Sequence, residues 1–369
     1  MGNRGSKKID EPQQILPPEI IFEILSWLPL RSLSQMQLVC KAWQELIYDH
    51  HFIGKHMNRS NVVCYWHNVT VSSDYRQSPP KSDSFSYVHG CDGLVLLKNN
   101  SKHKYCLWNP AVRRVLELPD PHGHNHGFAL SFVPSTGRYI IVAIYSDEES
   151  GALSCEVLTP GHSKMWRHLT FPDINANRQR KTEKVSLISS GGVDHCVLVL
   201  SDGKEIIREI VSLDLEAECF TVNHLPKGLF DDWETVWDLE WNGKLAFAVI
   251  IEQNLEVMIL EDYKKGRWSL KKKAIRLTFL EKYKYPQENI FPLFAKNGDI
   301  WFWLKNEKIL VYTIETVQIA HVIRSEAFSP ENKLYVYKPS LITFEGMQPD
   351  TNMAKLRPPK FDRLFDRLS

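Results

Sequence analysis

Three alternating histidines are the side chains of this chain that could most readily bind a metal ion. His122, His124 and His126 lie in the run Pro-His-Gly-His-Asn-His-Gly. Imidazole is a common zinc ligand, but a zinc site usually needs further ligands at short, regular spacing. The neighbours are glycine and asparagine, and no carboxylate or cysteine lies at such a spacing. We interpret the segment as a solvated loop and predict no metal and no other cofactor.

The compact motifs by which common enzymes position a phosphate, a nucleophilic serine or a catalytic zinc ion are missing. The sequence contains no GxxxxGK, no GxSxG and no HExxH. Lys271-Lys272-Lys273, with Lys264, Lys265 and Arg267 nearby, forms a basic cluster. Such a cluster usually keeps an exposed strand edge soluble, and an acidic partner is the alternative. None of these features therefore indicates a catalytic site.

Composition excludes several further classes of function. The formal net charge of the 369 residues is +1, which argues against nucleic acid as the main partner, because phosphate binding needs a clustered basic surface. No run of eighteen apolar residues is present, so we expect no membrane span. The seven cysteines are widely spaced and form no CxxC pair, which is typical of reduced thiols in the cytoplasm or nucleus.

The first residues fit the pattern for N-myristoylation. Gly2 would be exposed after removal of Met1, and Ser6 stands at the required place. Nearby basic residues, Arg4 and Lys7 among them, would add attraction to an anionic membrane surface. The alternative is a flexible basic leader over residues 1–14. Acylation of Gly2 would bring the protein to the plasma membrane as a peripheral protein.

Residues 15–60 predict a compact module of three helices. Pro18 suits the first position of a helix, and Pro29 ends that helix. A second helix is expected over about 31–40 and a third through Trp43. Apolar residues surround most of the first helix, namely Ile20, Ile21, Phe22, Ile24, Leu25, Trp27 and Leu28. A helix of this kind needs cover on more than one side, either from the rest of the chain or from another protein.

This block resembles the F-box, the helical module that joins a protein to the SCF ubiquitin ligase. F-boxes commonly begin Leu-Pro, continue with a Glu-Ile-(apolar)-x-x-Ile-Leu helix and Leu-Pro, and end in Val-Cys-(Lys/Arg)-x-Trp. Here these segments are Leu16-Pro17, 19–25, Leu28-Pro29 and 39–43. The resemblance implies that nine residues contact a Skp-type adaptor or hold the surface that does: Leu16, Pro17, Ile20, Ile24, Leu28, Pro29, Leu33, Val39 and Trp43.

From residue 61 to 346 the pattern changes to short runs rich in β-branched and aromatic residues, bounded by turn residues. Four of the turns have hairpin character, Asp92-Gly93, Asp202-Gly203, Asn242-Gly243 and Asn297-Gly298. With Thr136-Gly137 they recur with a loose period near fifty residues. Repeated antiparallel units predict an all-β propeller-like domain of about six blades; a two-sheet sandwich is the alternative. The whole chain is then α+β and multidomain.

This β domain is similar to the F-box-associated, kelch-like domain of plant F-box proteins. That family carries a Gly-(Ser/Cys)-x-Gly-Leu segment followed by Trp-Asn-Pro-(Ala/Ser)-x-(Arg/Lys). This chain has Gly90-Cys-Asp-Gly-Leu94 and Trp108-Asn-Pro-Ala-Val-Arg113. Strict kelch repeats are not present. We interpret Trp108-Asn109-Pro110 as structural, an aromatic packed between blades beside a proline-enforced turn.

Together the two resemblances imply the substrate-recognition subunit of an SCF-type E3 ubiquitin ligase. The F-box would bind the Skp-type adaptor and through it cullin, and the β domain would bind an unknown protein substrate. Two alternatives stay open: a membrane-anchored F-box scaffold acting outside the ligase, and a propeller lectin or hydrolase. A tail over residues 347–369 ends in the doubled unit Phe361-Asp-Arg-Leu-Phe-Asp-Arg-Leu368, which fits a short amphipathic helix.

Overall fold

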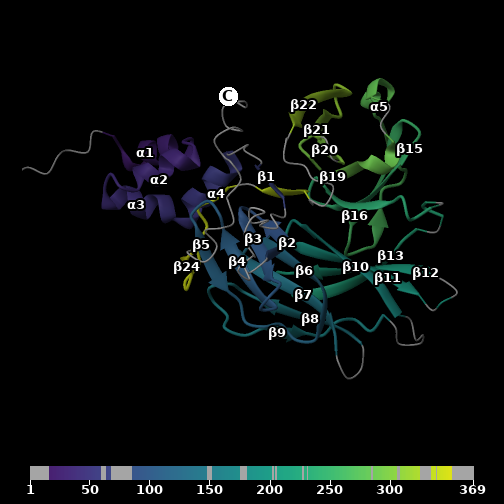
Figure 1. Ribbon diagram of the computed structural model, residues 1–369, viewed down its shortest axis with the longest axis horizontal. Helices are drawn as coiled ribbons and strands as arrows, with labels where there is room; N and C mark the ends of the chain where they lie inside the picture. The colour runs from purple at the N-terminus through teal and green to yellow at the C-terminus, as the bar shows by residue number, and fades with distance from the viewer. Residues whose placement is uncertain are drawn as a thin grey trace, which may run out of the picture.

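The structure is a computed structural model. It describes residues 16–59, 64–67, 85–147, 152–174, 181–201, 203, 206–226, 228–230, 232–283, 286–305, 308–324, 334–337 and 339–350. Its helical module lies beside a larger body of strands (Figure 1).

The module contains four helices, where the sequence predicted three: α1 Pro18–Ser26, α2 Leu30–Met36, α3 Lys41–Tyr48 and α4 His50–Arg59. The extra break falls at Asp49, whose backbone is extended. Its Oδ1 accepts the backbone N–H groups of His51 (2.9 Å) and Phe52 (3.1 Å) and so caps α4. The two proline-led helices begin where they were expected, because Pro17 and Pro29 are the N-caps of α1 and α2.

The strands form successive antiparallel units of four or five. The first unit consists of β2 Phe85–Cys91, β3 Leu94–Asn99, β4 Lys104–Asn109, β5 Arg114–Glu117 and the later strand β24 Gln348–Pro349. The second consists of β6 His124–Val133, β7 Arg138–Ser146, β8 Leu153–Leu158 and β9 Arg167–Leu169. The third consists of β10 Lys181–Ser190, β11 Val193–Ser201, β12 Ile206–Asp214 and β13 Cys219–His224.

The fourth and fifth units share one sheet, because their first strands pair in parallel. They consist of β14 Trp237–Trp241, β15 Leu245–Ile251, β16 Asn254–Asp262, β17 Arg267–Trp268 and β18 Lys273–Arg276, then β19 Ile290–Lys296, β20 Asp299–Leu304, β21 Lys308–Thr313 and β22 Gln318–Arg324. A separate pair joins β1 Cys64–His67 to β23 Leu334–Tyr337.

First strands of consecutive units lie side by side, in the order β2, β6, β10, β14 and β19, and β23 lies next to β2 (Figure 1). This arrangement is that of propeller blades around an axis. The predicted fold class, a small all-α module followed by an all-β propeller-like domain, is confirmed. In the described part of the chain five units have four or more strands, and the remaining sheet is the two-stranded pair β1–β23.

One glycine turn in each complete unit joins its first strand to its second. The glycines are Gly93, Gly137, Gly192, Gly243 and Gly298, spaced 44 to 55 residues apart. All five have positive φ, which a residue with a Cβ adopts only at a cost. Gly203 was expected to belong to this series. It lies instead between β11 and β12, and the third unit uses Gly192.

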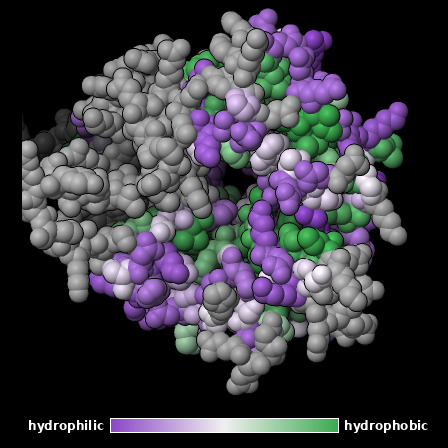
Figure 2. All heavy atoms as spheres, turned by 45° about the vertical axis from the view of Figure 1, so that its right-hand side comes forward, coloured by the Kyte–Doolittle hydropathy of each residue, from purple (hydrophilic) through white to green (hydrophobic). Residues whose placement is uncertain are grey.

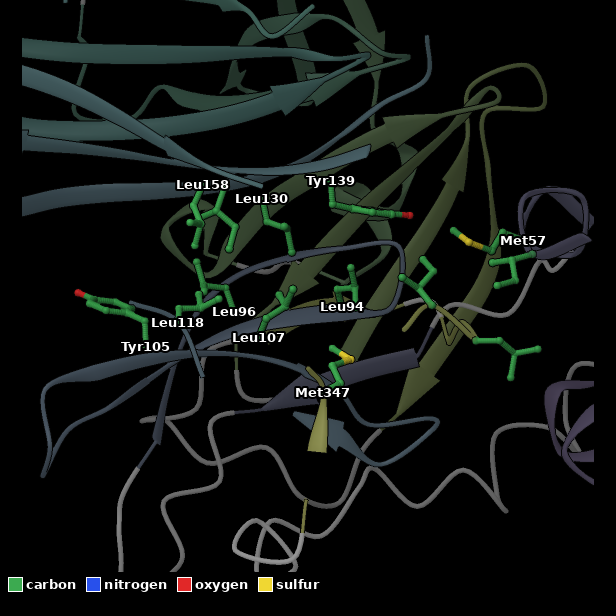
Figure 3. Close-up of a cluster of buried hydrophobic side chains, with 14 of the residues drawn as sticks. Met57, Leu94, Leu96, Tyr105, Leu107, Leu118, Leu130, Tyr139, Leu158 and Met347 are labelled. Carbon is green, nitrogen blue, oxygen red and sulfur yellow. The ribbon is translucent and has the colours of Figure 1, made fainter. Parts of the chain in front are cut away.

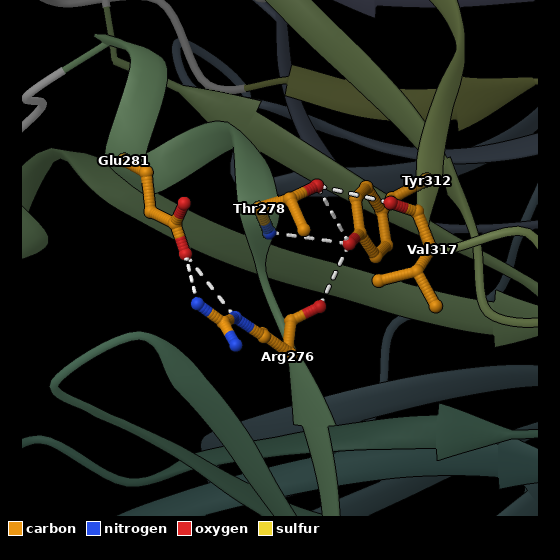
Figure 4. A network of polar contacts seen from close by, with 5 residues as sticks. All are labelled: Arg276, Thr278, Glu281, Tyr312 and Val317. Atoms are coloured by element: carbon orange, nitrogen blue, oxygen red, sulfur yellow. Dashed lines mark hydrogen bonds and ion pairs between the residues drawn. The ribbon is translucent and has the colours of Figure 1, made fainter.

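Polar contacts also hold the fourth and fifth units together, through helix α5 (Thr278–Tyr283) between them. The Tyr312 hydroxyl donates to the Arg276 carbonyl (2.7 Å) and accepts from the Thr278 N–H (3.2 Å). Arg276 also forms an ion pair with Glu281 (2.6 Å), and Thr278 Oγ1 donates to the Val317 carbonyl (2.9 Å; Figure 4). A long connection precedes β19, and this network holds that connection against the body of the fifth unit.

A buried carboxyl joins the second and third units and should make stability depend on pH. The Ser131 hydroxyl donates to Asp194, which is 1% exposed. Burial raises the pKa of the Asp194 carboxyl to about 6, although the hydrogen bond from Ser131 lowers it in part. Because the folded state disfavours the charged form, stability from this group is present at low pH and is lost as pH rises through about 6.

We expect Asp194→Asn to stabilise the protein at pH 7.5 by up to about 3 kcal/mol, since one pKa unit corresponds to about 1.4 kcal/mol. The amide keeps an acceptor for Ser131 and carries no charge. At pH 4 the variant and the wild type should unfold at nearly the same urea concentration, and the difference should grow between pH 4 and 7. A difference that is equal at both pH values would contradict the assignment.

Residues just beyond 346, where the tail was expected to begin, pack onto the β domain. Met347 is 8% exposed and Asp350 5% exposed, and β24 adds a fifth strand to the first unit beside β5. The folded domain therefore continues to Asp350. The structural interpretation of Trp108 and Asn109 is confirmed, because they are 1% and 0% exposed. The helix expected over 361–368 lies outside the described residues.

Candidate functional site

One face of helix α1 remains open to solvent although it is apolar. Ile20 and Ile24, one helical turn apart in α1, are 45% and 49% exposed, and Leu16, which precedes the helix, is 44% exposed. On the adjacent side of the same helix, Ile21 and Leu25 are 7% and 1% exposed. The helix is thus apolar on two sides, as the sequence predicted, and its own chain covers only one of them.

Further exposed apolar residues lie in the segment that joins α2 to α3 and at the end of α1. Val39 is 59% exposed, as is fitting for a predicted contact residue, and Leu38 beside it is 80% exposed. Trp27, at the end of α1, is 68% exposed. Leu38 and Trp27 are absent from the predicted set. In the sequence Leu38 stands next to Val39 and Trp27 stands near Pro29, but the residue type alone could not show that these side chains are exposed.

The nine predicted residues therefore divide by burial. Leu33 is 0% exposed, and Leu28 and Trp43 are half-buried against the same hydrophobic cluster. These three residues pack in the interior of the module, beneath the exposed residues. The remaining six are exposed: Leu16, Pro17, Ile20, Ile24, Pro29 and Val39. We call these six, with Trp27 and Leu38, the exposed apolar face.

Ion pairs between α1 and α4 hold the helix that carries this face. The Glu23 carboxylate accepts from Lys55 and from Arg59 (2.7 Å to Arg59), and these hydrogen bonds lower the pKa of Glu23. The Arg59 guanidinium also lies 4.5 Å from the ring centroid of Trp27. The His56 ring contacts the Leu28 carbonyl at 2.9 Å. Helix α1 is therefore fixed to α4 on its polar side as well as through its apolar core.

The opposite side of the module merges with the propeller-like domain. Phe52, Ile53 and Met57 of α4 belong to the same buried hydrophobic cluster as Leu94 and Leu107 of the first unit. Figure 3 shows Met57 at the side of this cluster nearest the helices, with Leu94 and Leu107 inside it. The module is therefore sealed against the strands on one side, while the exposed apolar face remains uncovered on the other.

The histidine segment is only partly the loop that the sequence predicted. His124 and His126 lie in strand β6, so that expectation is wrong for these two. His122 Nδ1 contacts the buried carboxylate of Glu156 at 2.7 Å, and Glu156 Oε1 accepts the His122 backbone N–H at 2.9 Å. Within the ranges that the structure describes, no group of three or more His, Cys, Asp or Glu residues is arranged to hold a metal ion.

The basic cluster lies at the edge of a sheet, as predicted, and several of its charges are paired. Strand β18, which begins at Lys273, pairs only with β16. Lys272 forms an ion pair with Glu256 (3.2 Å), and Lys264 forms one with Asp214 (3.1 Å). The cluster therefore presents less free charge than its sequence suggests.

Two other predictions fall on parts of the chain that are not described. Gly2, the candidate for acylation, lies outside the described residues. The end of the tail does as well. No helix in the described part is both long and apolar enough to cross a membrane.

Comparison with known proteins finds a matching family model for the β domain and one for the helical module. A family model described as "F-box associated beta propeller domain" matches residues 48–328, and one described as "F-box-like" matches residues 14–59. A protein of Arabidopsis thaliana named as an F-box protein is 26% identical over 347 residues, covering 84% of this chain and 85% of the relative. Another is 24% identical over 277 residues, covering 69% of each.

A likeness to solved structures is much weaker. An exo-beta-1,3-galactanase from Phanerochaete chrysosporium aligns with 74% of this chain and 71% of its own, at 9% identity and a TM-score of 0.36. That TM-score is too low to support any inference about activity.

Proposed function

Because this chain belongs to the plant F-box proteins with a C-terminal F-box associated beta propeller domain, we propose that it is the substrate-recognition subunit of an SCF-type E3 ubiquitin ligase. Its F-box binds a Skp-type adaptor and through it cullin. Its propeller-like domain binds the protein to be ubiquitinated. The chain catalyses no step itself.

One observation carries this proposal: the exposed apolar face of the F-box. Leu16, Ile20 and Ile24, with the neighbouring Val39, leave side chains 44% to 59% exposed on a module whose other side is buried. Contiguous exposed apolar residues on a soluble protein mark a surface that another protein covers. The matching family model supports an adaptor as that protein.

In this mechanism ubiquitin transfer is accelerated because the substrate is tethered. A substrate held on the propeller-like domain is kept near the ubiquitin-charged enzyme that the cullin brings, so transfer becomes effectively intramolecular. The F-box and the propeller-like domain share a buried core, which favours a fixed geometry between them. Figure 2 shows a face of the molecule with a hollow near its middle, bordered in part by polar and apolar residues.

The proposal also includes location. A ligase subunit with free, unpaired cysteines suits the cytoplasm and nucleus. Acylation of Gly2 would add a population at the plasma membrane, and intact-mass measurement of the protein from plant tissue decides that point.

Co-purification with the adaptor tests the function. We expect the wild type to co-elute with a Skp-type adaptor in gel filtration and Leu16→Ala/Pro17→Ala to lose most of that co-elution. Both residues are exposed, so the variant should fold. A folded variant that co-elutes like the wild type would refute the receptor proposal.

A further inference from the structure

The C-terminal end of the described chain is held by residues near the start of the β domain. We call residues 339–350 the strap. Asn109 Nδ2 donates to the carbonyls of Ser340 (3.0 Å) and Ile342 (2.8 Å). Asn109 Oδ1 accepts the Ala111 N–H (3.0 Å), so one buried amide fixes both its own turn and the strap.

A second set of contacts fastens the far end of the strap at Asp350. The Trp108 indole N–H donates to Asp350 Oδ2 (3.1 Å), and Arg113 Nε lies 3.3 Å from Asp350 Oδ1. The Asp350 N–H donates to the Arg113 carbonyl (3.1 Å). We call Trp108, Asn109, Arg113 and Asp350 the clasp. Three of its members come from the Trp-Asn-Pro segment and the turn that follows it.

Two buried side chains of the clasp donate hydrogen bonds to the strap. Asn109 is 0% exposed and Trp108 is 1% exposed. A buried N–H without an acceptor destabilises the folded state, and here the strap supplies acceptors for both side chains. The side-chain types at 108 and 109 are thus explained by a segment more than two hundred residues away.

The strap in turn packs where the F-box meets the propeller-like domain. Leu341, Ile342 and Met347 are buried in the cluster that also contains Phe52 and Met57 of α4. Figure 3 shows Met347 beside the first-unit leucines of this cluster, and Figure 1 places β24 and β5 close to α4.

Phe344 extends the strap toward the second unit. Its ring meets that of Tyr139 at 5.9 Å, edge to face. The strap therefore touches the first and second units and shares a core with the F-box.

We propose that the clasp residues are positioning residues that set the orientation of the F-box on the propeller-like domain by holding the strap between them. This inference rests on the proposed function for its purpose, since a fixed orientation keeps a bound substrate at a constant distance from the ubiquitin-charged enzyme. Domains joined by a small interface move relative to one another by default, and the strap enlarges the shared core.

Spin labels on two native cysteines can measure this orientation in the absence of any adaptor. Cys40 in the F-box and Cys219 in β13 are both exposed and free. Burial raises the pKa of the Cys91 thiol, which slows its labelling, and Cys64→Ser removes a further thiol. In wild type we expect one narrow distance distribution by pulsed electron paramagnetic resonance.

Asn109→Asp is the decisive variant, because it replaces the donor that faces two carbonyls with an acceptor. We expect it to broaden the distance distribution, or to shift it, while adaptor affinity of the unlabelled protein stays at the wild-type value. Asn99→Asp is the matched control. Asn99 is 6% exposed in the same unit and uses its Oδ1 as an acceptor from Ser101 and Lys102, which a carboxylate can replace.

A folded Asn109→Asp variant with the wild-type distance distribution would overturn the proposal, even if its melting temperature fell. Should that variant fail to fold, Asp350→Ala at the edge of the unit provides the same test through the indole and Arg113 contacts. The distance measurement needs no adaptor, so a failure of adaptor binding would count against the proposed function and leave the strap result standing.

Discussion

Ile24→Asp is expected to abolish binding of the Skp-type adaptor without unfolding the protein. Ile24 is 49% exposed in the middle of the exposed apolar face, where a partner would bury it. Burying an unpaired carboxylate there, together with the loss of the apolar contact, should cost about 3 kcal/mol or more, which is roughly a hundredfold in Kd. Isothermal titration or surface plasmon resonance with purified adaptor measures this change.

Leu270→Asp is the matched control for this variant. Leu270 is 101% exposed on the propeller-like domain, so the substitution places the same charge at an equally accessible leucine far along the chain. We expect wild-type adaptor affinity and an unchanged melting temperature for Leu270→Asp. Equal affinities of Ile24→Asp and wild type would show that the adaptor binds elsewhere, and the exposed apolar face would need another partner.

The sequence predicted the part of the F-box that depends on local chemistry. Pro18 marked the start of the first helix and Pro29 its end, because proline is accepted in the first turn of a helix and not within it. The fourth helix was missed because its start depends on Asp49, a single capping side chain in a polar stretch. In the same way, Gly192 was not predicted to belong to the repeat, because Gly191-Gly192 lacks the Asn or Asp that marked four of the expected turns.

The division of the predicted site into exposed and buried residues could not be read from the sequence. Leu33 and Leu38 are the same residue type, five positions apart, yet one is 0% and the other 80% exposed. Leu33 lies on the side of α2 that the rest of the module covers, whereas Leu38 lies in the segment after that helix. Contacts such as that between Asn109 and Ser340 also could not be predicted, because the residues around Asn109 in the sequence do not indicate a partner so far along the chain.

Leu33 and Leu38 also give the second prediction with a large expected effect, which concerns stability. Leu33→Ala is expected to destabilise the F-box by roughly 2–5 kcal/mol, because it removes buried methyl groups and leaves a cavity in a packed core. Leu38→Ala should change the free energy of unfolding by less than about 0.5 kcal/mol, as exposed substitutions usually do. Urea unfolding followed by circular dichroism, with tryptophan fluorescence for the F-box, measures both.

Adaptor binding should respond to the two substitutions for opposite reasons. Leu38→Ala removes contact area from a folded surface, so its affinity should fall at every temperature below unfolding. Leu33→Ala leaves the exposed apolar face intact in the folded molecules, so its affinity should approach the wild-type value on cooling, as the folded fraction recovers. The reverse pattern, with Leu38→Ala binding normally and Leu33→Ala weak even when fully folded, would mean that the buried leucine becomes exposed on binding and that the F-box opens to receive its partner.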